Sequence, residues 1–88
     1  MEVEHHESVD GVQGDELLLG RSSWSADDRS LKYAWPDKNG RRARGGEMPV
    51  SAIPQAVAFA GRKGYLTREQ MAAIVKCLVD VLAEERGD

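Results

Sequence analysis

Cysteine is almost absent from this chain of 88 residues, in which Cys77 is the only one. A single thiol cannot form a disulfide within the chain, so a small scaffold held together by disulfides is excluded. Cys77 lies in an apolar run with helical spacing, where a thiol behaves as a small hydrophobic side chain. Neither a histidine nor a helix N-terminus lies near it in the sequence, and we therefore expect no nucleophilic role for it.

Long hydrophobic runs are also missing. The longest candidate, residues 71–83, has about 13 residues and contains Lys76 and Asp80, whereas roughly 20 apolar residues are needed to cross a membrane. The first 16 residues contain no Lys, no Arg and no apolar run, so they do not resemble a secretory signal. We therefore expect a cytoplasmic protein that makes no membrane contact.

Catalytic side chains are scarce. The two histidines, His5 and His6, lie in a segment that we expect to be disordered, and a general base must be held in place to act. No Cys and His residues have the spacing of a structural zinc site. We therefore expect a protein that is not an enzyme, holds no metal or cofactor and takes no small-molecule substrate.

What the chain does contain is charge, and its distribution is uneven. Residues 1–16, the acidic segment, hold six acidic and no basic residues. Residues 29–44, the basic segment, hold six basic residues and only Asp37 as an acid, although the net charge of the whole chain is −3. Residues 1–14 offer too little apolar surface to offset the entropy of ordering. We predict that they form a disordered acidic arm before a single domain over residues 15–88.

A β-hairpin is predicted over residues 30–48. Leu31, Tyr33 and Trp35 alternate with less apolar residues, which is typical of a half-buried strand, and residues 36–40 contain an Asn-Gly turn signal. If residues 36–40 form a five-residue loop, Trp35 faces Arg41. If only Asn39 and Gly40 form the turn, Trp35 faces Arg44, but Pro36 then lies inside a strand. We prefer the first register because proline is disfavoured there. The apolar run at residues 16–20 could add a third short strand.

Two helices are predicted after the hairpin. Ser51 can cap the first, which should continue to about Lys63 and end before Gly64. Thr67 and Gln70 fit a capping box at the start of the second, predicted over residues 68–86. We therefore predict an α+β fold in which the hairpin packs on two C-terminal helices.

The second helix is apolar over an unusually wide arc. On a helical wheel its apolar side chains cover roughly 220°, against a little over 100° for an ordinary surface helix. Lys76 and Asp80 belong to the narrow polar stripe that remains. The excess apolar surface favours a homodimer, and Val75, Val79 and Leu82 are the expected interface residues, together with Phe59, which lies off the core stripe of the first helix.

The basic hairpin is the other candidate functional surface. Guanidinium and ammonium groups bind phosphates and base edges, and neighbouring aromatic rings such as Tyr33 and Trp35 can stack. The candidate nucleic-acid-binding residues are Lys32, Lys38, Arg41, Arg42 and Arg44. We therefore expect a small regulatory protein that contacts nucleic acid. The alternative is a protein-binding adaptor, inhibitor or antitoxin-like module that uses its exposed apolar helix surface.

Overall fold

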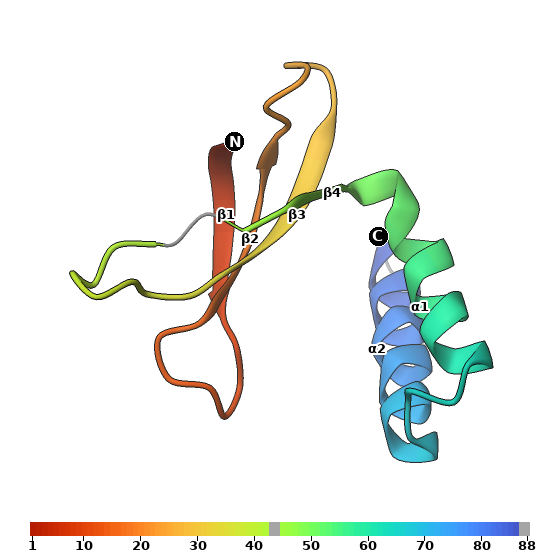
Figure 1. Ribbon diagram of the computed structural model, residues 1–88. Helices are drawn as coiled ribbons and strands as arrows, with labels where there is room; N and C mark the ends of the chain where they lie inside the picture. Colours follow the sequence, from red (N-terminus) through yellow and green to blue (C-terminus); the bar gives the residue numbers. More distant parts are fainter. Residues whose placement is uncertain (43–44, 87–88) are drawn as a thin grey trace. The chain divides into compact units, whose positions relative to one another are not determined.

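The computed structural model describes residues 1–42 and 45–86, which form a four-stranded antiparallel sheet and two α-helices (Figure 1). The predicted small α+β class is confirmed. The chain divides into two compact units, a strand unit over Met1–Ile53 and a helix unit over Pro54–Asp88. Each unit is described by itself.

The sheet of the strand unit has the strand order β1-β2-β3-β4, and all neighbours are antiparallel. Its strands are β1 (Glu2–Ser8), β2 (Glu16–Arg21), β3 (Arg29–Ala34) and β4 (Glu47–Pro49). Each strand therefore pairs with the one that follows it in sequence, and β1 and β4 form the two edges.

The N-terminal segment differs from its prediction, because Glu2–Ser8 form strand β1 within the predicted disordered arm. β1 pairs with β2 and has one irregularity in register, between Val3 and His5. Two side-chain contacts add to the backbone pairing of β1. Glu4 Oε1 lies 2.8 Å from Arg29 Nε, and His6 Nδ1 lies 3.0 Å from Glu16 Oε2. The composition argument considered only apolar burial, whereas β1 is held by backbone and ionic pairing.

The core of the strand unit is small. Leu18 and Ala34 are buried, and so are Ser22 and Ser30, whose hydroxyl oxygens lie 2.6 Å apart. Leu18 pairs with Lys32, and Glu16 pairs with Ala34, so Leu18 and Ala34 face the same side of the sheet. The serine pair satisfies two buried hydroxyl groups that would otherwise destabilise this core.

The register between β3 and β4 is not the preferred one. That register, with Trp35 opposite Arg41, would place Lys32 opposite residue 44, whereas Lys32 lies opposite Glu47. Pro36 forms an isolated bridge with Arg42 and is not part of either strand. Strand β3 ends at Ala34, before Pro36. The disfavour of proline inside a strand, on which the preferred register was based, therefore does not apply here.

The helix unit follows its prediction closely at the second helix. A 3-10 turn, η1 (Val50–Ala52), leads into α1 (Ile53–Arg62), and α2 spans Arg68–Arg86. The capping box is confirmed, because the Gln70 N–H donates to Thr67 Oγ1 at 3.0 Å and the Thr67 N–H donates to Gln70 Oε1 at 2.8 Å. No helix among the described residues combines the length and the apolar character needed to cross a membrane.

The ends of α1 show one confirmed and one wrong prediction. Gly64 has a φ of 78° and follows the helix as predicted. The N–H groups of Gly64 and Tyr65 donate to the carbonyl oxygens of Gly61 and Ala60, which is a Schellman ending. Ser51, however, does not cap α1: it lies inside η1, which begins after Pro49 without a side-chain cap. Serine is a common N-cap residue, but here the chain enters a 3-10 turn before the α-helix begins, and the Ser51 side chain caps neither.

Candidate functional site

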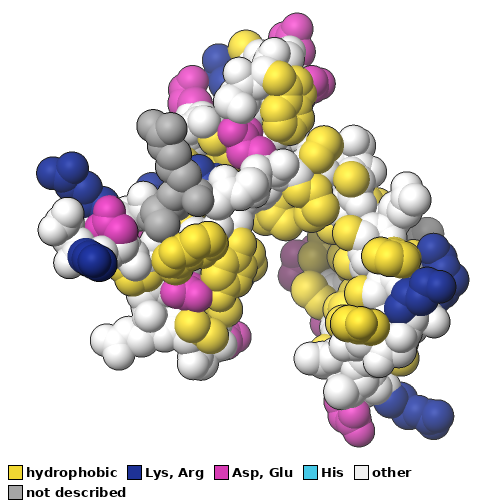
Figure 2. Space-filling view, viewed as in Figure 1, with side chains coloured by type: hydrophobic (Ala, Val, Ile, Leu, Met, Phe, Trp, Pro, Cys, Tyr) yellow, Lys and Arg dark blue, Asp and Glu magenta, His cyan; other side chains and the backbone are white. Residues whose placement is uncertain are grey.

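The most extensive candidate site is the apolar surface of the two helices. None of the described residues from Pro54 to Glu85 is buried. The large apolar side chains exposed on α1 and α2 form what we call the helix surface: Val57, Phe59, Met71, Val75, Leu78, Val79, Val81 and Leu82. Figure 2 shows apolar side chains lying open on this part of the molecule.

The four residues predicted for an interface all belong to the helix surface. Phe59, Val75, Val79 and Leu82 are 58%, 61%, 56% and 57% exposed. The polar stripe expected on α2 is also present, because Lys76 Nζ lies 3.1 Å from Asp80 Oδ2. Beside this polar stripe, the described apolar residues of α2 thus form an exposed surface wider than the apolar stripe of an ordinary surface helix.

A groove runs along the helix pair and continues the helix surface. α1 and α2 run in opposite directions (Figure 1), and an open groove of about 430 Å³ is lined by Val57, Gly61, Met71, Ile74 and Val75, among other residues. The sequence analysis missed this groove. Gly61, which has no side chain to fill the space between the helices, is the residue from which the groove could have been predicted.

Cys77 is exposed on α2. The sequence analysis placed it among the apolar residues of this helix, and it lies next in sequence to Leu78 of the helix surface.

The basic segment is partly neutralised by the acidic segment. Arg42 Nε and Nη2 lie 3.1 and 3.3 Å from the two carboxylate oxygens of Glu16, and Arg29 Nε lies 2.8 Å from Glu4. The hydrogen bond from Arg42 is the main reason why the pKa of Glu16 lies below its ordinary value of 4.5. Two of the six cations in this segment are therefore engaged within the sheet.

The remaining described cations of the basic segment lie in different surroundings. Lys32 is half-buried between Leu18 and Glu47, its neighbours on β2 and β4. Lys38 and Arg41 are exposed on a turn that the Asp37 carboxylate closes by accepting the N–H groups of Asn39 and Arg41. Within residues 1–42 and 45–86, none of these three cations forms an ion pair. Arg44 lies outside the described residues.

Two aromatic rings lie close in sequence to residues 37–41, which we call the basic turn. The ring centroids of Tyr33 and Trp35 are 6.4 Å apart with planes inclined by 43°, and both side chains are exposed. The Tyr33 hydroxyl donates a hydrogen bond to the Asp15 carboxylate, which raises the pKa of Tyr33 above 10. Trp35, Lys38 and Arg41 are thus exposed and close in sequence, whereas the hydroxyl group of Tyr33 is engaged by an acidic side chain.

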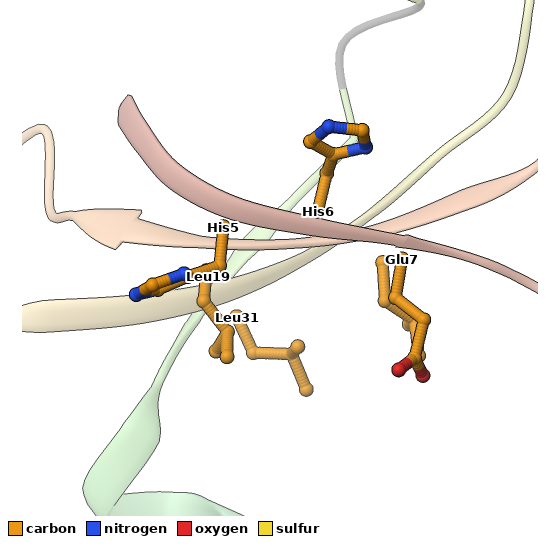
Figure 3. Close-up of a pocket in the computed structure, with 6 residues that line it drawn as sticks. His5, His6, Glu7, Leu19 and Leu31 are labelled. Carbon is orange, nitrogen blue, oxygen red and sulfur yellow. The ribbon is translucent and has the colours of Figure 1, made fainter.

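The histidines lie on an exposed strand. Among the described residues, no cluster of three His, Cys, Asp or Glu side chains could hold a metal ion. His6 points away from the side of β1 on which His5 and Glu7 lie (Figure 3). On that side a shallow pocket of about 200 Å³, which we call the β1 pocket, is lined mainly by His5, Glu7, Leu17, Leu19 and Leu31. Sequence reasoning missed it because it treated β1 as disordered.

Comparison of the chain with known protein families, with curated proteins and with solved structures finds no match. The function is therefore inferred from the surfaces of this chain alone.

Proposed function

We propose that this chain is a non-enzymatic binding module that forms a homodimer through its helix surface. The observation that carries this proposal is the absence of any buried residue among the described residues 54–85, although α1 and α2 are rich in large apolar side chains. A helix pair of this length is marginal in water without an apolar face packed against something. We also propose that the hairpin strands pack on the two C-terminal helices, as the sequence predicts.

The spacing of exposed residues on α2 favours another helix as the covering element. Met71, Val75, Leu78 and Leu82 alternate between four-residue and three-residue steps, which is the pattern of a helix seam in coiled coils and bundles. Met71 and Val75 also line the groove beside α1. Two helix pairs brought together along this seam would form a four-helix bundle, a stable arrangement of amphipathic helices.

The free energy available is sufficient for such a dimer. Complete burial of a Val, Leu, Phe or Met side chain contributes roughly 1.5–3 kcal/mol. The side chains of the helix surface are about half exposed, so covering them contributes on the order of 10 kcal/mol per copy. A dimer with micromolar affinity requires about 8 kcal/mol, and both copies contribute to a symmetric interface.

A pair of variants tests the proposal. Leu78→Glu places a charge in the centre of the seam, and we expect it to yield a monomer by size-exclusion chromatography with light scattering, because burial of an unpaired charge is strongly unfavourable. Ala73→Glu adds the same charge to an exposed residue of α2 that lies seven residues before Asp80, on the polar side of the helix, and this variant should remain a dimer. Equal masses for the two variants would argue against the seam.

Contact with nucleic acid is a second candidate function, favoured by the basic turn. Lys38 and Arg41 are exposed on a turn that its own Asp37 closes, close in sequence to the exposed ring of Trp35. This combination suits a phosphate backbone and an unstacked base. The neutralisation of Arg29 and Arg42 by acids of the same chain limits the surface to a few cations. Lys32, Arg42 and Arg44 stay in the proposed set as flanking residues.

A further inference from the structure

The outer edge of β1 has the features of an acceptor for another strand. Within the part of the chain that the structure describes, β1 pairs only with β2, so about half of its backbone N–H and C=O groups point away from the sheet. All seven of its residues are exposed. The opposite edge, β4, has three residues and ends at Pro49, which has no N–H to donate. β1 is therefore the edge at which the sheet can be extended.

Side chains around this edge define what an added strand would meet. The β1 pocket lies on the sheet face inward of this edge, because its lining includes Leu17 and Leu19 of β2 and Leu31 of β3. His5 and Glu7 of β1 border it on the side of the edge and lie on the same side of β1 as Leu19 and Leu31 (Figure 3). Its volume of about 200 Å³ is below the roughly 300–1,000 Å³ of small-molecule sites. The pocket is thus smaller than an ordinary small-molecule site, and a long apolar side chain of an added strand would reach its rim by lying across His5 or Glu7.

The charges of β1 decide the kind of strand. The strand contains Glu2, Glu4 and Glu7 and no Lys or Arg. Edge-to-edge pairing with a second copy would bring strands of the same negative charge together, which is unfavourable. Glu4 is already engaged by Arg29 and Arg21, at 2.8 and 3.7 Å, whereas within the described residues Glu2 and Glu7 form no ion pair. A strand with basic residues complements them.

We propose that β1 binds an extended basic peptide by strand addition. The peptide backbone pairs with the outer edge of β1, its apolar side chains on this face lie against His5 and the rim of the β1 pocket, and its Lys or Arg side chains lie near Glu2 and Glu7. This surface belongs to the strand unit, so the proposal is independent of the helix dimer. The backbone bonds provide affinity, and charge together with the pocket provides selectivity.

Three fluorescein-labelled peptides of equal length test this assignment with the full chain. The probe is Lys-Val-Val-Lys-Val-Val-Lys. The first control replaces each Val by Pro, which retains the charge but removes the N–H groups needed for pairing, and the second replaces each Lys by Glu. Fluorescence anisotropy should show binding of the probe that is at least about tenfold tighter than that of either control, a difference of about 1.4 kcal/mol.

Two charge-reversed variants locate the site. Glu7→Lys should weaken binding of the probe about fivefold, since an attractive exposed charge pair becomes a repulsive one. Glu69→Lys makes the same change in the first turn of α2, and this variant should bind the probe normally. Circular dichroism checks that both variants are folded. Equal binding of the Lys-Val and Lys-Pro peptides, equal effects of the two variants, or no binding of the probe would each overturn the proposal.

Discussion

The guanidinium group of Arg42 donates two hydrogen bonds to the carboxylate of Glu16, with nitrogen–oxygen distances of 3.1 and 3.3 Å. His6 lies 3.0 Å from the same carboxylate. Glu16 is the first residue of β2 and Arg42 follows the basic turn, so this contact joins the acidic and the basic segment inside one sheet. Through Glu4 and Glu16 the acidic segment is thus part of the fold.

This ion pair predicts a stability that depends on pH. The pKa of Glu16 is lowered chiefly by Arg42, and that of Glu47 chiefly by hydrogen bonding from Ser23. A carboxyl group with a lowered folded-state pKa stabilises the fold above its ordinary value of 4.5, and this contribution is lost as the pH falls through the folded-state value. Urea unfolding should therefore show a free energy that decreases below about pH 4.5.

Two substitutions separate this effect from general acid denaturation. The double variant Glu16→Gln and Glu47→Gln should be less stable than the parent chain at pH 7 and should lose less stability between pH 5 and pH 3. Glu84→Gln, in α2, is the control and should leave the profile unchanged. Parallel profiles for the parent and the double variant would show that these carboxylates do not stabilise the fold.

Gly20 provides a test of the pairing between β1 and β2. A Cβ atom at this position would overlap the carbonyl oxygen of Glu2 and lie 2.9 Å from the Cα of Val3. Gly20→Ala should therefore destabilise the strand unit by about 1–3 kcal/mol, as overpacking does elsewhere. At Gly46 a Cβ would meet no atom of the described residues within 4 Å, so Gly46→Ala should be neutral. An N-terminal segment that is not paired with β2 would tolerate both substitutions equally.

The two predicted helix caps give a matched pair. Thr67→Ala removes the hydroxyl that accepts the Gln70 N–H and should destabilise the helix unit by about 1 kcal/mol. Ser51→Ala removes a hydroxyl that caps nothing in η1 and should change stability by less than about 0.5 kcal/mol. Thermal unfolding followed by circular dichroism measures both. A larger effect at Ser51 would contradict the boundaries of η1 and α1.

Salt dependence decides whether the basic turn contacts nucleic acid. Each phosphate neutralised in B-DNA lowers log K by about 0.9 per unit of log salt concentration. Replacement of Lys38 and Arg41 by Ala should reduce that slope by up to about two units and leave the fold intact. Binding of duplex DNA weaker than about 0.1 mM at physiological salt, or a slope unchanged by the double replacement, would remove this candidate function.

Local signals explain which parts of the fold were predictable. The capping box of Thr67 and Gln70 and the Gly64 ending act within a few residues, and α2 was predicted with its observed bounds. β1 depends on partners far along the chain, such as Glu4 with Arg29 and Glu16 with Arg42. No periodic pattern in residues 2–8 predicts such contacts. The register of β3 with β4 likewise depends on pairing between distant segments.

The candidate site divides in the same way. The exposure of Val75, Val79 and Leu82 follows from the wide apolar arc of one helix, which the sequence shows directly. The number of unpaired cations in the basic segment cannot be predicted from the sequence in this way, because it depends on which acidic side chains the sheet places beside Arg29 and Arg42. The β1 pocket could not be expected without β1 itself.

Sedimentation equilibrium of the unmodified chain tests the central claim most directly. If the helix surface pairs with a second copy, the mass measured at micromolar concentration should be about twice the chain mass of 9.7 kDa. Dilution should shift it toward the monomer in a reversible equilibrium. A mass of one chain at all concentrations up to about 0.1 mM, where even dimers held by only 5–6 kcal/mol would form, would contradict the proposed homodimer.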